Sequence, residues 1–354
     1  MESLLFSVPY NNHPELLDEI FKLKNTGQNA IEEIFLCGPQ EYSGSGRITP
    51  IIHMEQFKEA VNKIHKEGIK TNLVLNSTCE GSRWYASEVV DATIGAVEQM
   101  HDELGIEAVT IANPLYIHEI RKRIKGIEIH ASVLGDIDCV QRAIIYRDAG
   151  VDVISTDVNI NRNLELLKRI KKATGARLKL LVNEGCLYKC PFRKFHFNAT
   201  SHVSKEIIEG AIDASYANFF GFGVKTIQKN QSQLLKSGWI RPEDLRRYSG
   251  ISNYFKVVDR AQLNNFILRA IKAYMNEGWD GDMLDLVSGC SKRFSLDFGA
   301  YLDNEKLGES GFFDKVTSCD NNCEICSYCD DLAKKLIKLN VLTKAKYEDV
   351  NRAP

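Results

Sequence analysis

The chain has 354 residues, of which 44% are hydrophobic and 26% are charged, and its formal net charge at pH 7 is −2. This composition is typical of a globular protein with a sizeable core. The small net charge excludes a general electrostatic attraction to nucleic acid, and we interpret the basic runs at residues 121–123 and 168–172 as solvated helix faces. No apolar run approaches the roughly 20 residues of a membrane-spanning helix, and the first residues are typical of a strand rather than a signal peptide, so we expect a cytoplasmic protein.

Apolar runs and helical patterns alternate along most of the chain. The apolar runs predict strands at residues 3–9, 31–37, 69–75, 108–111, 127–132, 151–155 and 176–182. Helical spacing of apolar residues predicts helices between them, for example at residues 13–24, 54–66 and 86–104. A glycine often follows such a helical pattern and precedes the next strand, as expected where a helix ends in the left-handed conformation.

The predicted strands show almost no polar alternation, which indicates parallel strands that helices cover on both faces. An eighth short strand at residues 254–260, followed by an amphipathic helix at 262–276, would close a barrel. A doubly wound sheet is less consistent with the sequence, because no Gly-x-Gly-x-x-Gly turn follows the first strand. We therefore predict a (β/α)8 TIM-type barrel over residues 1–278 and a cysteine-rich C-terminal extension, packed on the barrel, over residues 279–354.

The active site of such a barrel lies at the carboxyl ends of its strands. The stretch at residues 183–198 follows the seventh strand and combines an acid, an arginine and two cysteines. Including residues that end other strands, the candidates for acid–base chemistry or for holding an anionic substrate are Glu184, His130, Asp157 and Arg193. His130 is equally consistent with a hydrogen-bonded histidine of the core, and Asp157 with an ordinary turn residue.

A second group of cysteines lies near the C-terminus, and its four members are Cys319, Cys323, Cys326 and Cys329. In a reducing compartment this density indicates metal ligation rather than disulfides. The Cys-x2-Cys-x2-Cys spacing allows three thiolates to reach one face of a cubane cluster, while a distant cysteine, often followed by proline, supplies the fourth. Cys190, which precedes a proline, fits that role, and Cys186 is its competitor. Structural zinc is the alternative metal, since four thiolates also satisfy tetrahedral coordination.

Several stretches together resemble peptidase family U32, the collagenase-like group. They are Leu4–Tyr10, Ile31–Gly38 with Gly46 and Arg47 downstream, Ile129–Ser132, Leu181–Cys186 and Tyr254–Arg260. The resemblance implies an α/β barrel that carries an oxygen-sensitive [4Fe–4S] cluster on four cysteines. It also implies oxygen-independent hydroxylation, as in ubiquinone synthesis or in the modification of transfer and ribosomal RNA, although other members are called peptidases.

Cys186 and Cys190 match the family's first cysteines after the seventh strand, but no cysteine lies between Cys190 and Cys290, where relatives usually place their remaining ligands. The C-terminal cysteines are the obvious replacement. We therefore hypothesise a [4Fe–4S] enzyme that performs redox or hydroxylation-type chemistry on a small-molecule or RNA substrate, with a possible electron-donor protein. The alternatives are a peptidase, although the sequence lacks Gly-x-Ser-x-Gly and His-Glu-x-x-His motifs, and a non-catalytic barrel whose structural zinc site docks a partner.

Overall fold

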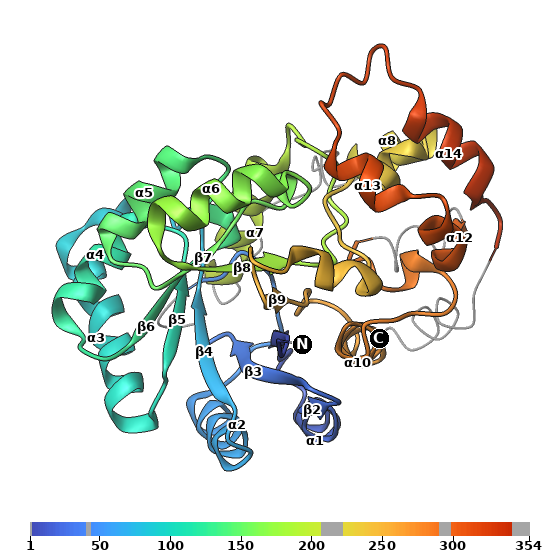
Figure 1. The fold of residues 1–354 in the computed structure, drawn as a ribbon. Helices are drawn as coiled ribbons and strands as arrows, with labels where there is room; N and C mark the ends of the chain where they lie inside the picture. The colour runs from blue at the N-terminus through green and yellow to red at the C-terminus, as the bar shows by residue number, and fades with distance from the viewer. Residues whose placement is uncertain (1, 40–43, 207–221, 290–298, 342–354) are drawn as a thin grey trace.

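The computed structural model describes residues 2–39, 44–206, 222–289 and 299–341. Within these ranges eight parallel strands form a barrel (Figure 1), in which β1 pairs with both β3 and β9 and thereby closes the sheet. The strands are β1 (Leu5–Pro9), β3 (Asn29–Leu36), β4 (Lys70–Leu75), β5 (Ala108–Ile111), β6 (Glu128–Ala131), β7 (Val153–Ser155), β8 (Arg177–Leu181) and β9 (Tyr254–Lys256). The predicted TIM-type barrel is confirmed, and each predicted strand overlaps a real one. A short strand, β2 (Asn25–Thr26), pairs antiparallel with β3.

Helices surround the barrel on its outside, as Figure 1 shows. They are α1 (Pro14–Lys22), α2 (Met54–Lys66), α3 (Ser87–Leu104), α4 (Pro114–Arg123), α5 (Val140–Ala149), α6 (Leu164–Thr174) and α10 (Asn264–Met275). Each helix has an apolar side that packs inward; in α2, for example, Phe57, Val61 and Ile64 are buried. Gly105, which ends α3, adopts a φ of 72°, a left-handed conformation that a side chain would disfavour.

The chain between β8 and β9 is longer than a single helix, and it contains α7 (Arg193–Glu206), α8 (Phe222–Lys229) and α9 (Ser232–Lys236). After α10 come α12 (Asn304–Glu309), α13 (Phe312–Thr317) and α14 (Tyr328–Leu336), together with the paired strands β10 (Tyr301–Leu302) and β11 (Ile337–Lys338). This C-terminal part packs beside the barrel, where α14 contacts α9 and Phe312 stacks on Trp239 (Figure 1). Cys290 lies outside the described residues, and the domain boundary at residue 278 stays a prediction.

Short turns of 3-10 helix complete the described elements. They are η1 (Ser82–Tyr85), η2 (Val133–Gly135), η3 (Val158–Ile160), η5 (Pro242–Tyr248) and η6 (Met283–Asp285). In the part of the chain that the structure describes, no helix combines the length and the apolar character needed to cross a bilayer.

The interior of the barrel contains a polar layer below an upper layer that faces the carboxyl ends of the strands. The lower layer consists of Glu33, Asn72, His130, Lys179 and Tyr254, all almost completely buried. Two positions further along the same five strands are Phe35, Val74, Ser132, Leu181 and Lys256, which form the upper layer. Because side chains of a strand alternate between its two faces, a step of two residues moves up the barrel without leaving its interior.

The lower layer is a hydrogen-bonded network around a buried ion pair. The Lys179 ammonium donates to a Glu33 carboxylate oxygen, and Asn72 Nδ2 donates to the other oxygen at 3.0 Å. His130 Nδ1 lies 2.9 Å from Asn72 Nδ2 and 2.6 Å from Lys179 Nζ, so it acts as an acceptor, while its Nε2 lies 2.6 Å from a carboxylate oxygen of Glu128. Burial, followed by the charge of Lys179, lowers the pKa of His130, which indicates a neutral ring with its proton on Nε2.

Candidate active site at the carboxyl end of the barrel

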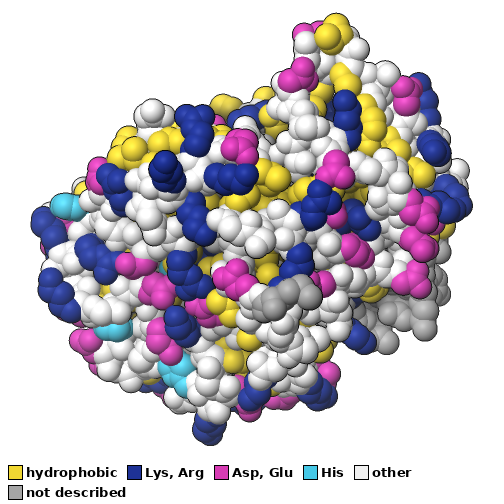
Figure 2. All heavy atoms as spheres, in the orientation of Figure 1, with side chains coloured by type: hydrophobic (Ala, Val, Ile, Leu, Met, Phe, Trp, Pro, Cys, Tyr) yellow, Lys and Arg dark blue, Asp and Glu magenta, His cyan; other side chains and the backbone are white. Residues whose placement is uncertain are grey.

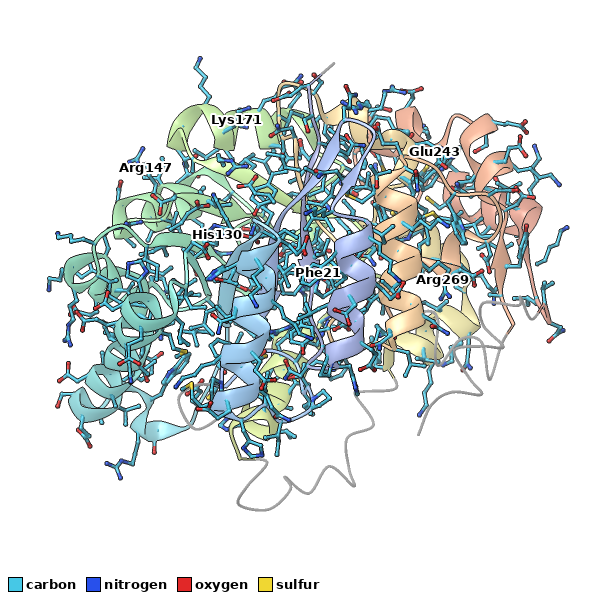
Figure 3. All side chains as sticks on the ribbon, turned by 90° about the horizontal axis from the view of Figure 1, so that it is seen from below. Phe21, His130, Arg147, Lys171, Glu243 and Arg269 are labelled. Carbon is cyan, nitrogen blue, oxygen red and sulfur yellow. The ribbon has the colours of Figure 1, made fainter. Side chains whose placement is uncertain are left out.

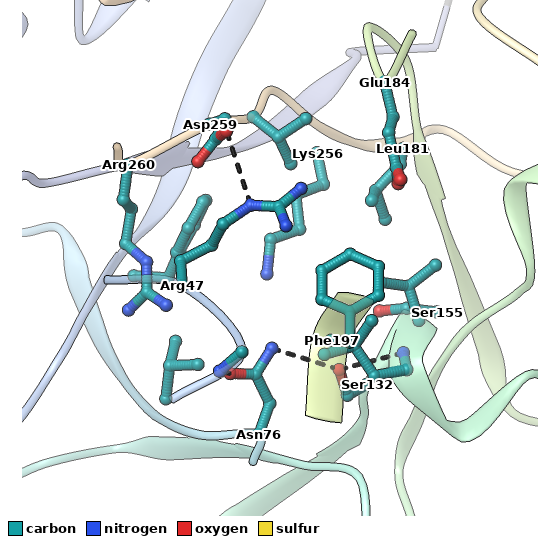
Figure 4. Close-up of a pocket in the computed structure, with 16 residues that line it drawn as sticks. Arg47, Asn76, Ser132, Ser155, Leu181, Glu184, Phe197, Lys256, Asp259 and Arg260 are labelled. Atoms are coloured by element: carbon teal, nitrogen blue, oxygen red, sulfur yellow. Dashed lines mark hydrogen bonds and ion pairs between the residues drawn. The ribbon is translucent and has the colours of Figure 1, made fainter. Parts of the chain in front are cut away.

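A small pocket lies at the carboxyl ends of the barrel strands, directly above the polar layer, and has a volume of about 60 Å³ (Figure 4). Its walls come from the ends of β3, β4, β6, β7, β8 and β9, and from helix α7 through Phe197. The polar and charged side chains that line it are Arg47, Asn76, Ser132, Ser155, Glu184, Lys256, Asp259 and Arg260. This is the end of the barrel at which the sequence predicted the active site.

Arg47 and Asp259 form an ion pair across the pocket, with 3.4 Å between Arg47 Nε and Asp259 Oδ2 (Figure 4). The Arg47 guanidinium also lies 4.5 Å from the centre of the Phe197 ring. Asp259 accepts further hydrogen bonds from the Ala261 backbone N–H at 2.9 Å and from the Ser288 hydroxyl at 3.2 Å. Burial by itself would raise the pKa of Asp259, but the Arg47 charge and these hydrogen bonds outweigh it and lower the pKa. Asp259 is therefore a charged and well-satisfied carboxylate.

Arg260 holds a fixed position beside the pocket. Its guanidinium donates at 2.7 Å to the Cys37 sulfur at the end of β3 and at 2.7 Å to the Ser45 hydroxyl. Arg260 is 4% exposed, so these contacts hold a cation in a nearly water-free environment. A cation in such an environment interacts strongly with anionic groups nearby.

Glu184 and Arg193, two of the four predicted site residues, meet in this region. Their side chains form a two-point ion pair, in which Arg193 Nη2 lies 3.2 Å from Glu184 Oε2 and Nη1 donates to Oε1. Both side chains are buried. Burial would raise the pKa of Glu184, but the charge of Arg193 and its hydrogen bonds lower it. The pair therefore contributes no net charge, and Glu184 lines the pocket as a neutralised carboxylate.

His130 and Asp157, the other two predicted site residues, do not line the pocket. His130 belongs to the polar layer one step below it, where it contacts Asn72 and Glu128. Figure 3 shows His130 in the interior of the molecule, behind helix α2. Asp157 caps the short turn η3, since its carboxylate accepts from the Asn159 backbone N–H at 2.8 Å, and burial raises its pKa. His130 therefore has a structural role in the polar layer, and Asp157 has one in the turn η3.

Cys186 and Cys190 lie next to each other in the loop after β8. Their thiols share a hydrogen bond, which lowers the pKa of Cys190 to about 6 and raises that of Cys186. Arg193 and the backbone N–H groups that follow Cys190 also favour the thiolate of Cys190. The loop therefore presents one thiolate and one thiol side by side.

The C-terminal cysteines border a second, larger cavity of about 450 Å³. Cys319, Cys323 and Cys329 line it on one side, and Tyr188 and Lys189, from the loop between Cys186 and Cys190, line it on the other. The segment that carries most of these cysteines, residues 318–327, projects from the body of the protein (Figure 1), and Figure 2 shows hydrophobic side-chain atoms at its tip.

The nine cysteines within the described ranges are all free. Thiolates are the preferred ligands of iron–sulfur clusters and of structural zinc, so the residue types around the large cavity fit such a group. The side chains stand in two groups, however, and no three His, Cys, Asp or Glu side chains within the described ranges are arranged to hold a metal ion. A cluster bound by both groups would require the projecting segment to move toward the loop after β8.

Sequence reasoning did not single out Lys256, Arg47 or Phe197 as site residues. Lys256 carried a usable signal, because a lysine within the apolar strand Tyr254–Val258 is unusual unless its side chain reaches a polar interior. Arg47 and Phe197 gave no comparable signal. They reach the pocket from a loop and a helix that are far from each other in the sequence.

A closed parallel barrel with a charged pocket at the carboxyl ends of its strands defines a TIM-barrel protein whose site has the position used by enzymes of that fold. The family model "Peptidase family U32" matches residues 19–188. An uncharacterized protease of Methanocaldococcus jannaschii is 31% identical over 327 residues, which cover 92% of this chain and 95% of that protein. The chain therefore belongs to peptidase family U32.

A solved structure supports the fold. The structure of a U32 peptidase aligns with a TM-score of 0.50 and 17% identity, and the alignment covers 59% of this chain and 80% of the other. At this identity the likeness concerns the fold alone.

Proposed function

We propose that this chain is a barrel enzyme that uses a [4Fe–4S] cluster for redox or oxygen-independent hydroxylation-type chemistry on a small-molecule or RNA substrate. The observation that supports the proposal is the shared cavity, which both cysteine-bearing segments border. The ligands would be Cys186 and Cys190 together with thiolates from the C-terminal group, Cys319, Cys323, Cys326 and Cys329. When bound, such a cluster supplies electron transfer or an iron with Lewis-acid character.

The chain's own cations support this use of the cavity. Arg162, Lys189 and Lys236 line it, and a site that gathers several thiolates needs such positive charge. Burial raises the pKa of Cys329, but Lys236 and Arg162 oppose this effect. Burial in turn lowers the pKa of Arg162 to about 10, so Arg162 keeps its charge at neutral pH. These cations would stabilise thiolates in a partly buried place.

The proposal assigns the two cavities different roles. The pocket at the barrel mouth takes the substrate, while the cysteine-lined cavity lies at the surface, where an electron-donor protein can approach the projecting segment. We also propose that the protein works in the cytoplasm, because free cysteines at this density are kept reduced there.

Anaerobic purification followed by iron and sulfide analysis tests the proposal. We expect about four iron and four sulfide per chain, together with thiolate-to-iron absorption near roughly 400 nm. Cys186→Ala and Cys326→Ala should each lose the cluster. Cys139→Ala is the matched control, since Cys139 precedes helix α5 and lines neither cavity, and it should keep the full content.

Three outcomes would contradict the proposal. Protein that contains stoichiometric zinc and no iron would favour a structural zinc site that docks a partner. Peptide hydrolysis that survives complete removal of iron would favour a peptidase, the activity in the family's name. Retention of the cluster in only one of the two variants would separate the two cysteine groups into different sites.

A further inference from the structure

Lys256 ends strand β9, and its amine points into the pocket at the barrel mouth (Figure 4). The residue is only 8% exposed, and its Nζ lies 3.8 Å from the centre of the Phe35 ring. Within the described ranges the contact of the amine is with the Phe35 ring, and no hydrogen bond or ion pair with a carboxylate contributes to its environment. Buried lysines usually have such a partner, so this amine is unusual.

The surroundings of Lys256 favour the neutral amine. Burial lowers its pKa well below the ordinary value, and the positive charges of Lys179 below it and of Arg260 beside it lower the pKa further. Glu33 opposes this effect, but its carboxylate is already bonded to the Lys179 ammonium. A neutral amine carries a free electron pair, so at neutral pH Lys256 can act as a nucleophile.

The rest of the pocket favours an anionic ligand. Arg47 and Arg260 line it, whereas the charge of Glu184 is cancelled by Arg193. Asp259 is the one other carboxylate among the described lining residues, and Arg47 already neutralises it. A ligand carboxylate would therefore meet a net positive environment in which water is scarce.

The pocket leaves room for a small molecule or for one end of a larger one. Its inner space of about 60 Å³ can hold several non-hydrogen atoms beside the amine. A ligand of that many non-hydrogen atoms can carry one carboxylate and one further functional group. A carbonyl is the group with which a neutral primary amine reacts.

We propose that Lys256 is a catalytic nucleophile that forms an imine with a small carbonyl compound bearing a carboxylate. The Lys256 nitrogen bonds to the carbonyl carbon, the carbonyl oxygen leaves as water with the two protons of the amine, and a carbon–nitrogen double bond remains. No oxidant, reductant or metal takes part. The inference goes beyond the proposed iron–sulfur function, because it concerns a different cavity and needs no cluster.

The test uses the full-length protein with pyruvate as the probe and cyanoborohydride to reduce any imine to a stable amine. Peptide mass spectrometry then measures the adduct at each lysine of the same sample. We expect labelling of Lys256 at pH 7 to exceed that of Lys168, an exposed helix lysine, by at least tenfold. An amine with the usual lysine pKa of roughly 10.4 would be labelled about tenfold faster for each pH unit below that value. Labelling of Lys256 should instead change little above pH 7.

Two comparisons test the role of the pocket. Acetone has the same carbonyl but no carboxylate, so it should label Lys256 several-fold less than pyruvate. Arg47→Met, which also leaves Asp259 without its partner, should reduce the pyruvate adduct more strongly than the acetone adduct. Lys256→Arg, checked for folding by circular dichroism, should lose the adduct at this position and retain the slow labelling of surface lysines.

The proposal is wrong if Lys256 in the unmodified chain is labelled no faster than Lys168, or if its labelling rises about tenfold per pH unit above pH 7. Either result would mean that Lys256 is a charged amine held against the Phe35 ring. Protein stripped of iron by a chelator should give the same adduct. Failure of the cluster proposal therefore leaves this result unchanged, and the two proposals can fail separately.

Discussion

Replacing Lys179 with methionine should be among the most destabilising single substitutions in the barrel. Methionine keeps most of the length of the side chain and removes the ammonium that pairs with Glu33. Both side chains are at most 1% exposed, so water cannot replace the lost partner. In Lys179→Met the Glu33 carboxylate would keep hydrogen bonds from Ser7 and Asn72 but would have no paired lysine.

The size of the effect follows from burial. Removing one partner of a buried ion pair costs roughly 3–5 kcal/mol, because the other charge is left in a low-dielectric interior. Lys168→Met is the control, since the side chains of Lys168 and its partner Glu165 are 54% and 79% exposed. An exposed pair contributes about 0–1 kcal/mol, so the control should be nearly neutral.

The pH dependence gives a second, independent signature. Burial would raise the pKa of Glu33, but the charge of Lys179 and the hydrogen bonds from Asn72 and Lys179 hold it well below the ordinary 4.5. In the native protein Glu33 therefore contributes stability above pH 4.5 that is lost as the pH falls through its lower folded pKa. In Lys179→Met, burial should raise the pKa of Glu33 above 4.5. The variant therefore loses stability as the pH rises through this raised pKa. The loss of unfolding free energy in Lys179→Met relative to the native protein should therefore be larger at pH 7 than at pH 5.

Urea unfolding followed by circular dichroism at both pH values measures these differences. The double variant Glu33→Gln/Lys179→Met should be more stable at pH 7 than Lys179→Met alone, because it buries no unpaired charge. A loss below about 1 kcal/mol for Lys179→Met, or a deficit that is the same at pH 5 and pH 7, would refute the assignment of a charged pair inside the barrel.

Two further substitutions test other parts of the structure. Arg193→Ala leaves the Glu184 carboxylate buried and unpaired, so it should lower the free energy of unfolding by roughly 3–5 kcal/mol. Arg83→Ala is its control and should cost less than about 1 kcal/mol, because the side chains of Arg83 and its partner Glu88 are 77% and 62% exposed. Equal effects in urea unfolding would contradict the burial of Arg193. Gly238→Ala should prevent soluble expression, because a Cβ there would lie 2.1 Å from the Val158 carbonyl oxygen. Gly95→Ala is the control: it lies in an uncrowded position of helix α3 and should stabilise the protein by about 0.5–1 kcal/mol. A soluble, stable Gly238→Ala protein would contradict the close approach of Gly238 to the Val158 carbonyl.

Much of the barrel could be predicted because its strands are marked locally. A strand buried on both faces is apolar along most of its length, so the run at 176–182 identifies β8 without knowledge of its neighbours, even though it contains Lys179. Pairing cannot be identified in this way. That β1 lies between β9 and β3, and so closes the barrel, depends on contacts between residues far apart in the chain.

The candidate site likewise has features that neighbouring residues reveal and features that only the fold reveals. Glu184 and Arg193 lie nine residues apart in one loop and helix, so inspection of residues 183–198 selected both residues, but only the structure shows that they form an ion pair. The rule that active residues follow barrel strands also selected His130, but it identifies the end of a strand rather than the direction of each side chain. His130 points into the polar layer below, and Lys256, two positions beyond Tyr254 on β9, faces the pocket.

The sequence by itself determined the strand-and-helix order, the membership of a barrel class and the presence of two cysteine groups, because each depends on residues that are close together in the chain. The tertiary structure decided which charges meet. Lys179 and Glu33, on strands far apart in the chain, pair inside the barrel, and Arg47 reaches Asp259 across its mouth. The physical reason is that burial sets the strength of an electrostatic interaction, and burial is a property of the folded chain.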